Sequence, residues 1–347
     1  MNIAFFSSSD FTLPILESIR DSQNKPFWQV LKLQLDELDI DWKSTLPDNF
    51  EELIMGLRQD CSTPINLQTV VSQPDREYRK KIIVNPIANF AKKNSIPTWT
   101  PHNLNKELTN QLDEVDLLLT ASYGQFVGSR ALNKPNLGCL NWHPSLLPKY
   151  RGATPLQSSL LVGDNQVGLS WIDMTKKMDE GRVYWQISKA VVDSDNFNNL
   201  INYFGLFGQR TWAIAIACKL LNLGFNQNNS LATDCNKFDK EYKLINPKIL
   251  QASDIFRHYR ALIDFPGTSF ADQYFGCEVK ILECRVVKND FKKEEFSIQK
   301  HDNWLVLKDS KKQLVLLECG NNSLLEVSKI CLSTGKVIDF RGYQFLS

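Results

Sequence analysis

The feature that most constrains this fold is a regular alternation of short apolar runs with segments long enough to form helices. Apolar runs typical of buried strands occupy residues 2–6, 68–72, 116–122, 138–142, 167–174 and 183–191. Helical patterns lie between or after them, near residues 13–19, 86–93, 106–112, 155–162 and 198–221. Strands separated in this way favour βαβ units, and therefore a mostly parallel sheet covered by helices.

This alternation ends near residue 224. The stretch that follows, up to residue 240, is polar, rich in Asn and without periodicity, which indicates a linker. A helix is expected at 252–263. Short strand-like runs then occupy residues 278–287, 304–308, 314–319 and 324–330. Several short strands with turn residues between them favour a small β-barrel.

These patterns divide the chain into three parts. We predict a first domain at residues 1–222, a linker at 223–240 and a second domain at 241–347. The first domain contains one irregularity, because residues 23–66 are too many for a connection between a helix and a strand. That interval holds two helical patterns, around residues 28–38 and 49–58, and we interpret it as a partly helical insertion.

Composition and charge exclude several classes of protein. The chain has 347 residues, of which 43% are hydrophobic and 23% are charged, as in an ordinary globular protein of two domains. A net charge of +1 lacks the strongly basic balance of many nucleic-acid-binding proteins, although a local basic patch remains compatible with it. The apolar stretches fall far short of the ~20 residues that span a membrane. The N-terminus lacks the basic region of a secretory signal, so we expect a cytoplasmic enzyme.

The cysteines and histidines do not form a metal-binding pattern. None of the eight Cys has the CxxC spacing, and the four His are far apart in the sequence. We expect reduced, partly buried thiols and no metal site.

The segment NWHPSLLPKYRG begins at Asn141 and leaves the carboxyl end of a predicted strand, where open α/β sheets place their ligands. Pro144 biases His143 toward an extended conformation. Because side chains two residues apart in an extended segment share a face, Asn141 and His143 are expected to point together. An amide donor beside an imidazole suits acyl-type transfer, since one group stabilises an oxyanion and the other moves a proton. A packed strand end with a hydrogen-bonded histidine is the alternative.

A carboxylate, Asp179, follows the strand predicted at 167–174. A buried carboxylate can orient an imidazole and stabilise its charged form. An Asp close to a Gly, here Gly181, is also typical of a plain turn. Spacing alone does not bring Asp179 to His143, so both interpretations stay open.

A basic run follows the strand predicted at 68–72. Four cations within QPDREYRKK could bind phosphates: Arg76, Arg79, Lys80 and Lys81. A solvated charged loop is the alternative. The chain has no GxGxxG and no P-loop motif, which disfavours dinucleotide and nucleoside triphosphate sites.

Several of these segments together resemble the formyltransferases that use 10-formyltetrahydrofolate, and within that family the methionyl-tRNA formyltransferases. The segments occur in the family's order: IAFFSSSDFTLPILESI, VVSQPDR, TASYGQFV, GCLNWHPSLLPKYRGATPLQ, MTKKMDEGRVYWQ, FPGTSF, VKILE and GKVIDFRGYQFL. The interval 23–66 has no counterpart in this resemblance. The family often has GLDTGD where this chain has KMDEGR.

The resemblance implies a fold and a reaction. The expected α/β fold has an N-terminal Rossmann-like, mostly parallel sheet with flanking helices, a linker and a small C-terminal OB-like β-barrel domain. The expected reaction transfers the formyl group of 10-formyltetrahydrofolate, the co-substrate, to the α-amino group of initiator methionyl-tRNA. No metal is required, and we expect a monomer without membrane contact.

The resemblance also assigns residues. The family's catalytic Asn, His and Asp fall on Asn141, His143 and Asp179. Folate is expected against one turn and one loop, formed by Ser145, Leu146, Leu147, Pro148, Ala121, Tyr123 and Gly124. The basic run is expected to bind tRNA.

Two other functions remain open at this stage. Nucleotide-sugar N-formyltransferases share the same three catalytic residues, although the basic run favours a tRNA substrate. A catalytically silent RNA-binding protein on the same scaffold would bind tRNA in a salt-dependent way and form no product.

Overall fold

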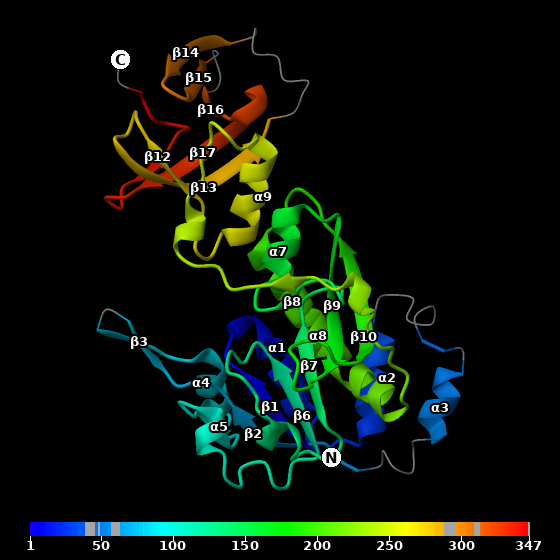
Figure 1. The fold of residues 1–347 in the computed structure, drawn as a ribbon. Coiled ribbons are helices and arrows are strands. Elements are labelled where there is room, and N and C mark those ends of the chain that lie inside the picture. Colours follow the sequence, from blue (N-terminus) through cyan, green and yellow to red (C-terminus); the bar gives the residue numbers. More distant parts are fainter. Residues whose placement is uncertain are drawn as a thin grey trace. The chain divides into compact units, whose positions relative to one another are not determined.

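The computed structural model of the chain describes residues 1–38, 46–47, 49–56, 63–78, 80–287, 296–308 and 313–345. They fall into two compact units (Figure 1). The first unit comprises Met1–Pro155, Gln166–Ala190 and Leu200–Cys235. The second unit comprises Leu156–Asn165, Val191–Asn199 and Asn236–Ser347.

The first unit is built on a sheet whose strand order is β10-β9-β7-β6-β1-β2-β5. The strands are β1 (Asn2–Ser7), β2 (Asn66–Val71), β5 (Thr98–Trp99), β6 (Leu117–Ala121), β7 (Cys139–His143), β9 (Gln166–Asp173) and β10 (Val183–Ala190). Neighbours from β7 to β5 run parallel, whereas β9 and β10 extend the sheet in antiparallel fashion. Every residue of β6 is buried, as expected for a strand covered on both faces.

Helices flank this sheet (Figure 1). They are α1 (Leu13–Asp21), α4 (Pro86–Lys93), α5 (Leu104–Glu107), α6 (Ser129–Leu132) and α8 (Phe197–Leu220). On one face, Phe6 of β1 packs in a cluster with Leu104 of α5 and Ala131 of α6. Elsewhere α8 is tied to α1, because the indole of Trp212 donates a hydrogen bond to Ser18.

The helix predicted at 106–112 is wrong in its extent. Helix α5 ends at Glu107, and the chain then turns. The side chain of Gln111 accepts a hydrogen bond from the Thr109 amide, and this local pairing competes with a helical ladder. Leu108 and Leu112 are nevertheless buried, so their apolar spacing reflects burial of the side chains and does not indicate a helix.

The two helices predicted inside the insertion are confirmed by α2 (Phe27–Glu37) and α3 (Phe50–Gly56). Helix α2 docks on α8 through Gln34, which is buried. The Gln34 amide donates to the carbonyl of Gln209 and accepts from the amide of Ala213. The intervening residues 39–45, 48 and 57–62 lie outside the described part of the chain.

The second unit contains a curled antiparallel sheet with the order β12-β13-β17-β16-β15-β14. These strands are β12 (Ser269–Asp272), β13 (Cys277–Val286), β14 (Ser297–His301), β15 (Trp304–Lys308), β16 (Gln313–Glu318) and β17 (Leu324–Leu332), and β18 (Val337–Asp339) pairs with β17. Helix α9 (Ala252–Leu262) packs into its core beside Trp304 and Phe340, and α7 (Pro155–Val162) also belongs to this unit. The predicted fold class, a mostly parallel α/β domain followed by a small OB-like domain, is confirmed.

Much of the stretch predicted as a linker lies along the first unit. Phe225 forms a β-bridge with Val183 of β10. Further on, β11 (Asp234–Cys235) pairs in parallel with β8 (Arg151–Gly152). Short 3-10 helices occur at Asp10–Thr12, Asn229–Leu231, Glu241–Lys243 and Gly320–Asn322.

Candidate active site

The end of β7 and the turn between β9 and β10 bring three polar side chains together. Asn141 and His143 both face Asp179, while Trp142 between them is buried and donates its indole N–H to the carbonyl of Phe204. The distance from His143 Nδ1 to Asp179 Oδ2 is 3.6 Å, and that from Asn141 Nδ2 to Asp179 Oδ1 is 3.5 Å. The fold thus brings Asn141 and His143 of β7 together with Asp179, which is distant from them in the sequence.

Main-chain geometry holds Asp179 in this position. Its φ is +53°, a left-handed conformation that is unfavourable for residues other than Gly. Asp179 Oδ2 accepts a hydrogen bond from the backbone N–H of Gly152 at 2.9 Å. Gly152 has φ +120°, and a Cβ there would lie 2.2 Å from the carbonyl oxygen of Cys235. A glycine is therefore required where β8 passes both Asp179 and β11.

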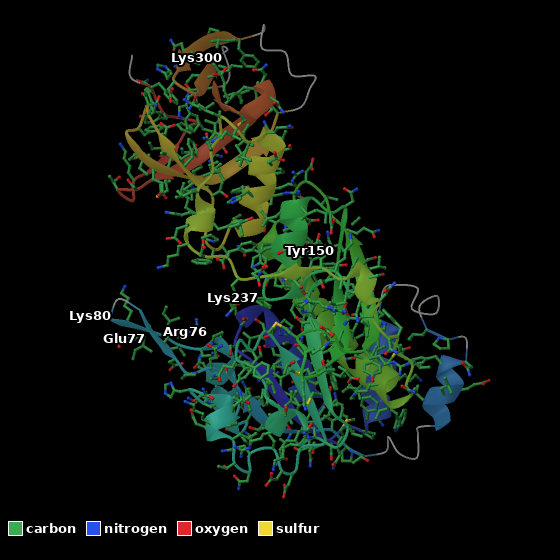
Figure 2. The ribbon with its side chains drawn as sticks, in the orientation of Figure 1. Arg76, Glu77, Lys80, Tyr150, Lys237 and Lys300 are labelled. Atoms are coloured by element: carbon green, nitrogen blue, oxygen red, sulfur yellow. The ribbon has the colours of Figure 1, made fainter. Side chains whose placement is uncertain are left out.

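The hydrogen bonds of His143 fix which ring nitrogen can take up a proton. His143 Nε2 lies 2.9 Å from the carbonyl oxygen of Tyr150, a residue marked in Figure 2. Because a carbonyl only accepts, Nε2 carries the hydrogen, and neutral His143 presents its lone pair at Nδ1. A proton taken up at Nδ1 lies beside the Asp179 carboxylate, with His143 and Asp179 only 4% and 12% exposed. Asp179 is therefore placed to stabilise the cationic ring.

The amide of Asn141 is oriented by the neighbouring strand. Thr120 of β6 donates its hydroxyl to Asn141 Oδ1 at 2.8 Å. Asn141 therefore directs its Nδ2 donor away from Thr120, and the contact of Nδ2 with Asp179 is long. One N–H of Asn141 remains suitable for an oxygen that becomes negatively charged.

The residues assigned to folate are Ala121, the last residue of β6, and six residues on the two adjacent loops that follow the paired strands β6 and β7. Four of the seven are buried: Ala121, Tyr123, Ser145 and Leu147. The other three reach the surface more fully, Gly124 being exposed and Leu146 and Pro148 half-buried. Any contact of these loops with a ligand therefore falls mainly on those three residues and on main-chain atoms.

Tyr123 faces the core. Its ring lies 5.1 Å from that of Phe6, and within the described part of the chain its buried hydroxyl has no hydrogen-bond partner. Burial, with a smaller contribution from Glu107, raises the pKa of Tyr123 above its ordinary value. The phenol is therefore neutral across the physiological pH range.

A cavity of about 280 Å³ lies at the carboxyl ends of β1, β2 and β6. Its lining is about equally polar and apolar and comprises Ser8, Ser9, Gln73, Pro74, Arg76, Ile83, Val84, Asn85, Pro86, Ser122, Tyr123 and Gly124. The chain passes from β1 to β2 on one side and later places β6 on the other side of β1. This reversal is the position at which open α/β sheets bind ligands.

The basic run forms a β-hairpin, which the sequence analysis interpreted only as a loop. Strands β3 (Arg76–Tyr78) and β4 (Lys81–Ile83) pair in antiparallel fashion. Figure 2 shows Arg76, Glu77 and Lys80 on this hairpin, which extends away from the sheet of the first unit. Lys81 is exposed as well, whereas Arg79 lies outside the described residues.

The same hairpin exposes apolar side chains. Ile82, Ile83 and Val84 are 73%, 55% and 51% exposed. Because Ile82 and Ile83 are consecutive on β4, their side chains point to opposite faces of the hairpin, so both faces expose apolar surface beside cations.

Four contacting residues were missed at the sequence level: Thr120, Tyr150, Gly152 and Gln227, whose side-chain amide donates to the carbonyl oxygens of Asp179 and Gly181. Each contributes one hydrogen-bonding group to the site: a hydroxyl, a carbonyl, a backbone N–H and a side-chain amide. The directions of these groups cannot be predicted from a pattern of residue types. Tyr150 and Gly152 stand in the motif that starts at Asn141, and Thr120 opens the segment TASYGQFV, so their positions were the available signals.

The described residues contain no group of three or more His, Cys, Asp or Glu side chains arranged to hold a metal ion. In that same part of the chain, no helix has both the length and the apolar character needed to cross a bilayer.

Comparison with known proteins identifies the family of both halves of the chain. A family model described as "Formyl transferase" matches residues 43–211, and one described as "Formyl transferase, C-terminal domain" matches residues 237–344. In the solved structures, an N-formyltransferase from Helicobacter canadensis in complex with folinic acid and dTDP-3-aminofucose has a TM-score of 0.56. It is 14% identical, over 94% of this chain and 97% of that one, and shows the shared fold.

Curated relatives are closer in sequence. A methionyl-tRNA formyltransferase of Mycoplasmopsis pulmonis is 31% identical over 251 residues, which are 70% of this chain and 83% of that protein. One of Staphylococcus epidermidis is 32% identical over 204 residues, or 57% of this chain, and the match spans 66% of that protein's length. By these matches the chain belongs to the formyl transferase family, of which the methionyl-tRNA formyltransferases are members.

Proposed function

We propose that this chain transfers the formyl group of 10-formyltetrahydrofolate to the α-amino group of methionyl-tRNA. The observation that carries this proposal is the arrangement of Asn141, His143 and Asp179 at the carboxyl end of the parallel sheet. It combines an amide donor, a proton acceptor and a carboxylate in a chain of the formyl transferase family. The names of the curated relatives support methionyl-tRNA as the acceptor.

The three side chains divide the chemistry among themselves. The neutral amine attacks the formyl carbon, and an α-amino group with a pKa near ~8 is neutral often enough for this. As the formyl oxygen becomes negative, Asn141 Nδ2 donates a hydrogen bond to it; one such donor contributes about 10²- to 10³-fold in rate.

The imidazole of His143 carries the proton from the attacking amine to the folate nitrogen. The attacking nitrogen loses its proton to His143 Nδ1, and Asp179 stabilises the cation so formed. His143 then returns this proton to the folate nitrogen as the bond from that nitrogen to the formyl carbon breaks. The products are the N-formyl amine and tetrahydrofolate, and no metal takes part.

The exposed hairpin supports a nucleic-acid acceptor. Arg76, Lys80 and Lys81 provide cations on a projecting element, and such cations bind phosphates. The apolar residues next to them suit contact with stacked bases. We propose that the hairpin binds the acceptor tRNA and that folate lies along the loops after β6 and β7.

The experiment that tests this function combines the full chain with 10-formyltetrahydrofolate and methionyl-charged initiator tRNA. Formyl-methionine on the tRNA is the expected product, lost in His143→Ala. Binding of folate without formation of this product contradicts the proposal. A UDP-amino sugar offered in parallel separates the nucleotide-sugar alternative, and tRNA binding without any product separates the silent RNA-binding alternative.

A further inference from the structure

One amide outside the catalytic cluster closes the turn that carries Asp179. Gln227 belongs to a segment that we call the strap, residues 225–235, which runs along the first unit beside β8. The Gln227 Nε2 group donates to the carbonyl oxygens of both Asp179 and Gly181, at 2.7 Å each. Its Oε1 accepts from Arg151 Nε at 3.0 Å and from Arg151 Nη2 at 2.9 Å.

The turn needs such support. Asp179 has a left-handed backbone, and a residue other than Gly persists there only where its surroundings determine the conformation. The two carbonyls that Gln227 holds flank Glu180, so a single amide fixes both ends of a three-residue turn. The same turn sets the direction in which the Asp179 carboxylate meets His143.

The strap also holds the other hydrogen-bond partner of His143. The Thr233 hydroxyl accepts from the Tyr150 amide at 2.9 Å, and the Thr233 carbonyl accepts from the Arg151 amide at 2.8 Å. Tyr150 has φ +61° and presents its carbonyl to His143 Nε2. Residues of the strap thus position a partner on each side of the imidazole ring.

We propose that Gln227 is a positioning residue for the catalytic centre: its amide fixes the Asp179 turn and thereby the proton-accepting geometry of His143. The kinetic part of this inference rests on the proposed formyl transfer. The geometric part does not, because it concerns the environment of His143 in the resting protein.

Two substitutions distinguish positioning of the Asp179 turn by Gln227 from a role in which Gln227 only attaches the strap to Arg151. Gln227→Glu keeps an acceptor for both N–H groups of Arg151 but removes the two N–H donors to the turn. Gln227→Met removes both kinds of bond at similar volume. Asn228→Ala is the matched control, since the exposed Asn228 side chain caps the 3-10 helix Asn229–Leu231 through Ser230 and, among the described residues, bonds neither the Asp179 turn nor Arg151.

The first measurement is steady-state formyl transfer by the full chain. Gln227→Glu and Gln227→Met are both expected to lower kcat about 10- to 100-fold, because small misplacements of catalytic groups have effects of that size. The KM for the formyl donor is expected to stay within about twofold of the wild-type value, as in the control. If Gln227→Glu retains wild-type kcat, the amide only anchors Arg151 and the inference is overturned, whether or not Gln227→Met folds.

The second measurement is the ¹⁵N spectrum of histidine-labelled protein, with His143 assigned from His143→Ala. The Nδ1 resonance of His143 is expected to shift in Gln227→Glu and to stay in place in Asn228→Ala. An unshifted Nδ1 resonance in Gln227→Glu overturns the inference even if activity falls. The ¹⁵N spectrum requires no catalytic turnover. If the wild-type protein does not transfer formyl groups, the proposed function is refuted, and the ¹⁵N spectrum still decides whether Gln227 positions His143.

Discussion

Replacing Asp179 by Asn removes one negative charge from the catalytic cluster and leaves its shape almost unchanged. The new amide oxygen can still accept the backbone N–H bond from Gly152, which in the wild type is 2.9 Å long. What is lost is the attraction between the Asp179 carboxylate and a proton on His143 Nδ1, across 3.6 Å, together with the long contact that Asp179 Oδ1 accepts from Asn141 Nδ2. The substitution therefore tests charge stabilisation apart from folding.

The size of the effect follows from that distance. Two unit charges 3.6 Å apart interact by about 4–5 kcal/mol at an effective dielectric constant of about 20. Water reaching the carboxylate, which is 12% exposed, offsets part of this, and about 3–4 kcal/mol remains. In rate, that corresponds to a factor of about 10² to 10³.

The assay is a single-turnover measurement of formyl transfer at saturating folate and methionyl-tRNA. Asp179→Asn is expected to slow the chemical step about 10²- to 10³-fold and to keep the wild-type melting temperature within a few degrees. Glu180→Gln is the matched control, because Glu180 lies on the same turn but pairs with Arg151 and Lys177. A chemical step within about threefold of wild type in Asp179→Asn would refute the assignment of charge stabilisation to Asp179.

Three further predictions concern other parts of the chain. Gly152→Ala places a Cβ 2.2 Å from the Cys235 carbonyl at φ +120°, so it should destabilise the first unit by about 2–5 kcal/mol; an unchanged denaturation midpoint contradicts this. Burial holds the pKa of His258 below its ordinary value of 6.5, so the unfolded chain takes up a proton that the folded one resists. Unfolding of the second unit should become easier as the pH falls below 6.5, and His258→Gln should weaken that dependence. Charge reversal at Lys80 and Lys81 should raise KM for tRNA and reduce its salt dependence without changing KM for folate; unchanged tRNA affinity means a merely solvated hairpin.

The secondary structure could be predicted where burial is periodic. The apolar run at 138–142 appears as β7, and the helical patterns of the insertion appear as α2 and α3. The pattern failed where polar side chains satisfy the backbone locally, as at Thr109, or where a charged and an apolar residue pair across an exposed hairpin, as Arg76 and Ile83 do. Apolar periodicity reports burial and not the type of element: Leu108 and Leu112 are buried without a helix, whereas the strand Lys81–Ile83 is exposed throughout.

The sequence by itself determined that a mostly parallel sheet precedes a small β-domain, and that Asn141 and His143 leave the carboxyl end of a strand two residues apart. Those properties follow from local patterns, because strand direction and alternation place side chains without reference to the rest of the chain. Only the tertiary structure decided that Asp179 meets His143 and that Gln227 closes the turn from Asp179 to Gly181. These contacts depend on main-chain atoms of residues with a left-handed backbone, such as Tyr150 and Asp179, which are far apart in the sequence. The directions of those atoms are set only when β8, the strap and the Asp179 turn pack together.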